Sequence, residues 1–101
     1  MIRSSKLKFR EIINPFFKNN RREGRGILYR NDGGRYEGEY KNDKAEGKGI
    51  FYFNNGDRYE GEFKNDKAEG KGTYHYYNEG RRYEGDWKDN KKEGKGNFIL
   101  W

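Results

Sequence analysis

The sequence predicts an all-β protein, built as a single-layer antiparallel β-meander of tandem hairpins. Two periodic tracts carry this prediction. A Tyr-Glu-Gly-acid-aromatic tract occurs at residues 36–40, 59–63 and 83–87, with starts 23 and then 24 residues apart. A Glu-Gly-Lys/Arg-Gly tract keeps step with it at residues 23–26, 46–49, 69–72 and 93–96. A fixed period of this size indicates a repeat array, in which each unit contacts only its neighbours.

The first run of each unit alternates between two faces. In residues 58–64, Tyr59, Gly61 and Phe63 fall on one face and charged side chains fall on the other. Alternation with period two predicts a half-buried strand. Residues 65–70 then break the pattern, and their Asn65-Asp66 start predicts a turn.

The second run of each unit, such as residues 71–76, is again strand-like and aromatic. Turn tracts follow it at residues 31–34, 54–57 and 78–80, and their Asn/Asp and Gly residues supply the positive φ of tight hairpins. The two runs therefore form a hairpin. Because the interval from Gly72 to Gly80 is one residue longer than that from Gly49 to Gly56, we expect a bulge or a longer turn near Tyr74–Tyr77.

The glycines inside the strands share a face with the rings. A ring on one strand can cover a bare glycine on the next strand, which predicts a continuous ladder of rings. Two interpretations stay open: the rings form the core, or part of the ladder stays open as a groove for a protein partner. The predicted ladder contains Tyr36, Tyr40, Phe51, Tyr59, Phe63, Tyr74, Tyr83, Trp87 and Phe98, and all of these except Phe98 are the predicted groove residues.

The net charge of +6 lies entirely at the amino end. Residues 1–22 hold seven basic residues and one acidic residue, whereas residues 23–101 hold sixteen of each. Nucleic acid and anionic lipid bind to a net basic footprint, so a balanced array argues against nucleic acid as a partner. Any electrostatic contact is expected from the amino-terminal segment.

The candidate catalytic motifs are repeated rather than unique. Carboxylates two residues apart occur in every unit, on the polar face beside lysine and arginine, as Glu37/Glu39, Glu60/Glu62 and Glu84/Asp86. Gly-x-Gly tracts lack the third glycine and the helix of a dinucleotide site. His75 is the only histidine and the chain has no cysteine. These features favour a structural interpretation and predict no enzyme activity, no cofactor and no metal.

Residues 1–16 differ from the array at 17–101 and are predicted to be a basic cap or arm. Ser4 or Ser5 could cap a short helix from Lys6 to Ile13 that ends before Pro15. The segment could cover the first hairpin, contact a membrane or partner, or act in targeting. The residues predicted to contact anionic lipid are Arg3, Lys6, Lys8 and Arg10. Pro15 stands where the later units have the strand glycine, so its strand is predicted to be an edge.

The pattern Tyr-Glu-Gly-Glu-aromatic-Lys-Asn-x-Lys-x-x-Gly-x-Gly-x-aromatic resembles the MORN repeat, and residues 59–74 fit it almost without departure. The resemblance covers residues 17–101, about three and a half repeats. It implies a non-catalytic scaffold of the kind found in junctional, axonemal and cytoskeletal assemblies. It also implies two alternatives: a peripheral membrane module that uses the basic amino-terminal segment, or a regulatory module of a larger enzyme such as a phosphatidylinositol phosphate kinase.

The last strand, residues 97–101, is the second run of a unit whose successor is missing. An uncovered edge strand pairs readily, so we expect either a fragment of a longer array or self-association through this edge. No apolar run reaches membrane-spanning length and no secretory signal is present, which predicts a cytoplasmic location. The resemblance adds the expectation of a cytoskeletal or membrane association.

Overall fold

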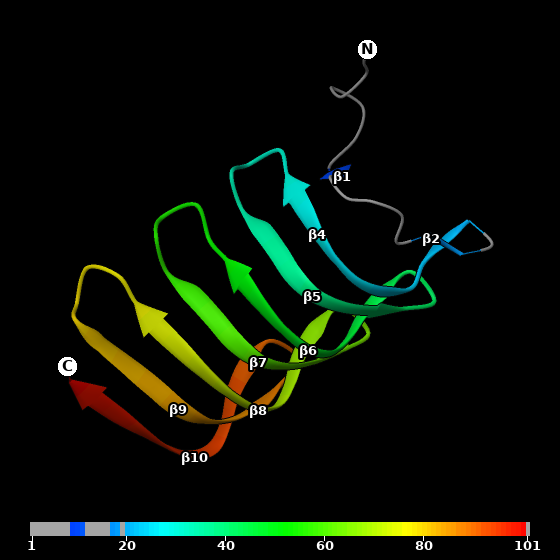
Figure 1. Ribbon diagram of the computed structural model, residues 1–101. Coiled ribbons are helices and arrows are strands. Elements are labelled where there is room, and N and C mark those ends of the chain that lie inside the picture. Colours follow the sequence, from blue (N-terminus) through cyan, green and yellow to red (C-terminus); the bar gives the residue numbers. More distant parts are fainter. Residues whose placement is uncertain (1–8, 12–16, 19, 101) are drawn as a thin grey trace.

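The computed structural model describes residues 9–11, 17–18 and 20–100, with side chains described from residue 20 onward, and it is an open antiparallel sheet (Figure 1). The all-β, single-layer prediction is confirmed. Eight strands follow the order β1-β4-β5-β6-β7-β8-β9-β10, and β2 pairs with β3 in a separate two-stranded sheet. The strands are β1 (Phe9–Glu11), β2 (Phe17–Lys18), β3 (Arg21–Arg22), β4 (Gly24–Arg30), β5 (Arg35–Lys41), β6 (Lys44–Tyr52), β7 (Arg58–Lys64), β8 (Lys67–Tyr76), β9 (Arg81–Lys88) and β10 (Lys91–Leu100). Nothing among the described residues forms a helix long and apolar enough to cross a membrane.

Two-residue turns join the first and second strand of each repeat. Lys41 pairs with Lys44, so only Asn42 and Asp43 form the loop, with φ angles of 50° and 71°. Positive φ at both positions is the geometry of a tight hairpin turn, and Asn and Asp adopt it more readily than other residues with a side chain. The same pair of positive φ angles recurs at Asn65-Asp66 and at Asp89-Asn90.

A row of glycines crosses the sheet from strand to strand. Gly61 pairs with Gly49 on one side and with Gly72 on the other. A Cβ at Gly61 would lie 2.5 Å from the Cα of Gly72, which is closer than real atoms approach. The row leaves room for rings: Tyr59 lies directly over Gly72, and Tyr36 lies over Gly49 in the same way. The predicted arrangement of a ring over a glycine is therefore confirmed.

The tyrosines in this arrangement are also fixed by hydrogen bonds. The Tyr59 hydroxyl donates to the Glu62 carbonyl at 3.0 Å, and Tyr36 donates to the Glu39 carbonyl at 2.8 Å. Burial raises the pKa of Tyr59 to about 12, because the sheet disfavours the phenolate. The rings meet edge to face with centroids about 5 Å apart, as Tyr59 does with Phe63 at 5.2 Å and with Trp87 at 5.1 Å. The buried residues are Leu28, Tyr36, Tyr40, Ala45, Tyr59, Phe63, Ala68, Tyr83 and Trp87.

Each repeat is joined to the next by the same set of hydrogen bonds, which we call the inter-repeat staple. In the central staple, the Asp66 carboxylate accepts from the Ala45 N–H at 2.8 Å and the Asp66 N–H donates to the Ala45 carbonyl at 3.1 Å. The Glu46 carboxylate accepts from the Asn65 N–H at 3.0 Å. The neighbouring staples use Arg22, Glu23, Asn42 and Asp43 on one side and Ala68, Glu69, Asp89 and Asn90 on the other.

The staple explains why the turn residues are Asn and Asp at both loop positions. The loop of one repeat must supply positive φ, and the second loop residue must also supply a side-chain oxygen to the preceding repeat. Backbone groups that would otherwise lack partners at the sheet margin are satisfied in this way. At the first staple, the Arg22 guanidinium also bonds Asp43 at 2.7 Å, and this hydrogen bond holds the pKa of Asp43 below its usual range.

The prediction of a helix from Lys6 to Ile13 is wrong at residues 9–11, which form β1. This strand pairs with β4, with Phe9 opposite Arg30 and Glu11 opposite Leu28. The unpaired backbone of β4 offers a ladder of hydrogen bonds to an adjacent chain segment, and this pairing outweighs the local helical spacing of the apolar residues. The remainder of the predicted helix, and Pro15, lie outside the described residues.

The extra residue near Tyr76 lengthens a turn and makes no bulge. The β8–β9 register runs without a shift to Tyr76 opposite Arg81, which leaves the four residues 77–80 in the loop. In the equivalent loop between β6 and β7, the Phe53 N–H donates to the Asp57 carbonyl at 2.9 Å. This loop therefore contains only the three residues 54–56. Bulges occur elsewhere, where the register shifts within the β5–β6, β7–β8 and β9–β10 pairs. Gly47, Gly70 and Gly94 adopt positive φ in these segments.

Candidate interaction groove

An aromatic groove of about 530 Å³ lies on the ring-bearing face of the sheet. Residues of β6, β7, β8 and β9 form its floor, and the turns between strands supply its rim. The lining residues are Arg30, Asp32, Phe51, Phe53, Tyr59, Phe63, Asp66, Ala68, Tyr74, Trp87 and Asn90. A second hollow of about 250 Å³ adjoins it toward β4 and β5 and shares Arg30, Phe51, Phe63 and Asp66 with it.

The accessible part of the groove is built from rings whose side chains are only half-buried or exposed. Phe53 is 37% exposed, and its ring centroid lies 5.5 Å from that of Tyr74. Tyr74 stacks on Trp87 with an interplanar angle of 25°. Trp87 itself is buried, and its indole N–H donates to the Gly72 carbonyl at 3.1 Å. The groove therefore has a rigid floor and a ring surface above it that a ligand could contact.

Charged groups on the rim are held by local partners. Arg30 lies 3.1 Å from Asp32, and the Gly34 N–H donates to the same carboxylate at 2.9 Å. The backbone hydrogen bond from Gly34, followed by that from Arg30, lowers the pKa of Asp32. The Tyr74 hydroxyl donates to Asp57 at 2.8 Å, and burial together with this acceptor raises the Tyr74 pKa above its usual range. These bonds hold the rim side chains in fixed orientations.

Cations cover rings at the two ends of the row of repeats. The Arg22 guanidinium lies 4.6 Å from the Tyr40 ring centroid, and the Lys92 ammonium lies 5.1 Å from that of Tyr83. Arg22 and Lys92 stand at the same position of the first and last repeats, directly before the Glu-Gly pair. The two central repeats have Ala45 and Ala68 at that position. Both alanines are buried, and the described cation nearest a groove ring is Arg30, 5.8 Å from the Phe51 ring centroid.

Most of the eight predicted groove residues belong to the core. Tyr36, Tyr40, Tyr59, Phe63, Tyr83 and Trp87 are buried, whereas Phe51 and Tyr74 are half-buried. The open ring that sequence reasoning missed is Phe53, together with the rim residues Arg30, Asp32 and Asp66. The period-two pattern could have found Phe53, because it shares a strand face with Gly49 and Phe51.

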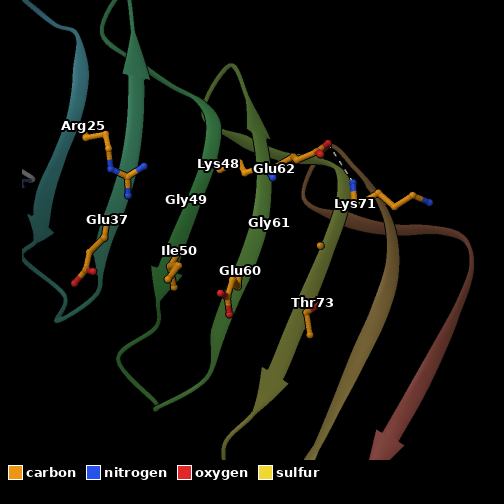
Figure 2. A pocket seen from close by; sticks show the side chains of 11 residues that line it. Arg25, Glu37, Lys48, Gly49, Ile50, Glu60, Gly61, Glu62, Lys71 and Thr73 are labelled. Atoms are coloured by element: carbon orange, nitrogen blue, oxygen red, sulfur yellow. Dashed lines mark hydrogen bonds between the residues drawn. The ribbon is translucent and has the colours of Figure 1, made fainter.

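The opposite face of the sheet is polar and holds a shallow hollow over the glycine row (Figure 2). Cations and carboxylates alternate from strand to strand along one side of this hollow. Arg25 faces Glu39 at 3.5 Å and Lys71 faces Asp86 at 2.9 Å. Glu62 also accepts from the Lys71 N–H at 3.4 Å, at the bulge of β7 and β8. Carboxylates of this row thus lie opposite cations on the neighbouring strands, an arrangement that favours strand pairing over like-charge contacts.

A second row on the polar face alternates arginine with aromatic side chains, and sequence reasoning missed it. Following the register across the sheet, the row runs Tyr29, Arg35, Tyr52, Arg58, His75 and Arg82. The Arg35 guanidinium lies 3.9 Å from the Tyr52 ring centroid and also bonds Glu37 at 2.8 Å. The array has no net charge, but its charges are sorted into rows by the strand register.

His75 is the one titratable residue of this row that ionises near neutral pH. Its side chain is 13% exposed, and burial, followed by the charge of Arg58, lowers its pKa. The charged groups that face it are Arg58 and Glu60 on β7 and Arg82 and Glu84 on β9. A lowered pKa means that the unfolded chain binds the proton more readily than the folded chain, so the sheet disfavours protonated His75.

We therefore expect His75 to make the chain less stable in mild acid. The stabilisation from neutral His75 is complete above the usual histidine pKa of about 6.5 and is lost as the pH falls through that value toward the folded-state pKa. His75→Tyr, which copies Tyr52 at the equivalent position, should show a smaller drop in melting temperature between about pH 7.5 and about pH 5.5. Carboxylate titration is common to both proteins, so equal drops would contradict the assignment.

The residues predicted to contact anionic lipid lie almost entirely outside the described residues. Arg3, Lys6 and Lys8 lie outside the described residues, and for Arg10 only its place in β1, opposite Tyr29, is described. Among the residues that the structure describes, no group of three or more His, Cys, Asp or Glu side chains is arranged to hold a metal ion.

The fold and the repeat together define an open β-repeat protein, with no second layer over the main sheet among the described residues. Comparison with protein-family models matches the MORN repeat four times, at residues 16–35, 36–58, 59–81 and 83–100. These matches span most of the chain, and the chain belongs to the MORN repeat family. The family is generally a non-catalytic repeat module. A search of curated protein sequences finds no match.

Proposed function

We propose that this MORN repeat protein is a non-catalytic scaffold that binds a segment of a protein partner in the aromatic groove. The observation that supports the proposal most is the uncovered ring surface of Phe53 and Tyr74 above the rigid floor at Trp87. An apolar surface rimmed by polar groups is typical of a protein-interaction site. A groove of about 530 Å³ has room for the side chains of a short segment rather than for a whole domain.

The occupant we propose presents two or three large apolar side chains. Ring-on-ring contact supplies most of the affinity at such sites, and the locally paired rim charges of Arg30 and Asp32 add orientation more than strength. Because the repeats are arranged with a constant period, a longer partner could contact successive repeats through the same kind of residue.

The test requires a substitution that changes the groove surface without removing the core. Truncation of Phe63 or Trp87 to Ala would cost about 3–5 kcal/mol, since both rings are buried, and a loss of binding would then report unfolding. Phe53→Asp changes an exposed ring instead. Tyr77→Asp is the matched control, because Tyr77 is 68% exposed and does not line the groove.

Peptides selected from a random library on the intact chain provide defined ligands for this test. We expect the selected peptides to carry closely spaced large apolar residues, and to lose at least about tenfold in affinity, or 1.4 kcal/mol, on Phe53→Asp. Tyr77→Asp should bind them normally. Selected peptides that bind both variants as tightly as the unaltered chain would overturn the groove as the binding surface.

A further inference from the structure

The outer edge of β10 differs from every other strand edge in the main sheet between β4 and β10. Within residues 20–100, β10 pairs with β9 on one side and no strand pairs with its other side. On the ring-bearing face it leaves Phe98 51% exposed and Leu100 77% exposed. An exposed edge of this length with apolar side chains is a template for pairing with another strand.

The sheet itself shows which partner sequence its second strands accept. Wherever the second strand of one repeat meets the first strand of the next, one glycine faces a ring and a second glycine, two residues on, faces a glycine. The pairs are Gly24 with Tyr40 and Gly26 with Gly38, Gly47 with Phe63 and Gly49 with Gly61, and Gly70 with Trp87 and Gly72 with Gly85. The glycine pair lets the strands approach closely, and the ring covers the neighbouring glycine.

The equivalent residues of β10 are Gly94 and Gly96, followed by Phe98 at the same spacing. Phe98 and Gly96 of β10 are two residues apart, as Phe63 and Gly61 of β7 are. An antiparallel copy of β10 could offer Phe98 and Gly96 where β7 offers Phe63 and Gly61. A second β10 would therefore place its Phe98 opposite Gly94 and its Gly96 opposite Gly96. The pattern of β10 thus complements its own reverse, and β10 is the second strand of a repeat whose outer edge has no partner within residues 20–100.

The polar face of the same register brings no like charges together. Lys95 would face Asn97 of the second copy, and Glu93 would face Ile99. Like charges directly opposite each other on paired strands are destabilising, and this register avoids them. The register also keeps Phe98 and Leu100 of both copies on the ring-bearing face, because it pairs even-numbered residues with even-numbered residues.

We propose that two copies of this chain pair through β10, antiparallel and with Gly96 on the twofold axis, to form one continuous sheet. The contact is isologous, so it closes at the dimer. It covers the exposed Phe98 and places two aromatic grooves in one molecule. This inference does not rest on the proposed function of the groove, since residues of β10 do not line that groove.

Sedimentation velocity over a range of concentrations tests the association. The chain should reach twice its monomer mass of 12.1 kDa as concentration rises. Phe98→Glu should remain monomeric under the same conditions, with a circular dichroism spectrum that confirms the sheet. Tyr77→Glu, at an exposed ring that lies against Gly56 and does not belong to β10, should dimerise like the unaltered chain. A chain that stays monomeric at every concentration, or an unchanged dimer of folded Phe98→Glu, would overturn the proposal.

Disulfide trapping tests the register without relying on Phe98. The sequence contains no cysteine, so Lys95→Cys and Asn97→Cys each introduce a single thiol. Directly opposed residues in an antiparallel pair have Cβ atoms roughly 4.5–5.5 Å apart, close enough for a disulfide after a small adjustment. A mixture of the two variants should crosslink faster than either alone. Faster crosslinking of Asn97→Cys with itself, or equal rates in all three samples, would contradict the proposed register.

Discussion

Gly61→Ala is expected to destabilise the chain by at least about 3 kcal/mol, which is large for the addition of one methyl group. The new Cβ would lie 2.5 Å from the Cα of Gly72 and 2.6 Å from the carbonyl oxygen of Lys71. Both are backbone atoms of the neighbouring strand, so a side-chain rotation cannot relieve the overlap. The strands would have to separate at the glycine row, which also carries the ring of Tyr59. Urea denaturation followed by circular dichroism measures the loss.

A glycine outside the row provides the control for this substitution. Gly24 has a φ of +84°, and a Cβ there would meet no atom within 4 Å. Asn tolerates positive φ, so Gly24→Asn should cost at most about 1 kcal/mol. If Gly61→Ala and Gly24→Asn cost the same, close contact between the glycines is not what the row requires.

Asp66→Ala is expected to cost about 1–3 kcal/mol by breaking the central inter-repeat staple. Ala45 is buried, and its N–H would lose the carboxylate acceptor that now lies 2.8 Å away. The loop would also lose a residue that adopts positive φ readily, since Asp66 has a φ of 70°. Thermal denaturation should show a lower melting temperature.

The array contains its own control for the staple. Asn90 stands at the position equivalent to Asp66, and its amide oxygen accepts from the Ala68 N–H at 2.8 Å. Asp66→Asn preserves both the acceptor and the tolerance of positive φ, so its stability should stay within about 0.5 kcal/mol of the unaltered chain. An Asp66→Asn variant as unstable as Asp66→Ala would show that charge, rather than the hydrogen bond, stabilises the junction.

The period-two pattern predicted the strands, the turns and the ring-over-glycine contacts because these depend on residues close together in sequence. Tyr59 and Gly72, for example, belong to one hairpin, although a bulge between Gly61 and Phe63 shifts the register that the turn at Asn65-Asp66 begins. The staple was not predicted, since it joins groups about 20 residues apart, such as Ala45 and Asp66. The prediction of a helix near Phe9 was wrong for a related reason. Residues 9–11 pair with β4, which lies about 20 residues away in the sequence.

Glycines of one tract play two roles that the sequence alone does not separate. Gly47 adopts a φ of +89° at a bulge, whereas Gly49 belongs to the close row and lies under the Tyr36 ring. The sequence shows only that both positions of the Glu-Gly-Lys-Gly tract are glycine. The groove was only partly predicted. The sequence pattern identified the rings, but it did not show that Trp87 is buried in the floor of the groove whereas Phe53 is exposed.

The sorting of charge into rows follows from register as well. Counting residues shows that the array is neutral, but Arg35, Arg58 and Arg82 fall in one row because each lies opposite the same repeat position of the preceding strand. Their neighbours in the row are Tyr29, Tyr52 and His75, which places the one histidine between two arginines. A stability dependence on mild acid therefore comes from strand pairing and not from a local motif.

Amide hydrogen exchange of the unaltered chain tests most directly the claim that staples join the repeats into one sheet. The Ala45 and Ala68 amides point away from their own hairpins and bond only to the side chains of Asp66 and Asn90 in the next repeat. Exchange from both should be as slow as from amides inside the β7–β8 ladder. Exchange from Ala45 and Ala68 as fast as from the exposed turn residue Asn78, while the ladder amides stay protected, would contradict the account.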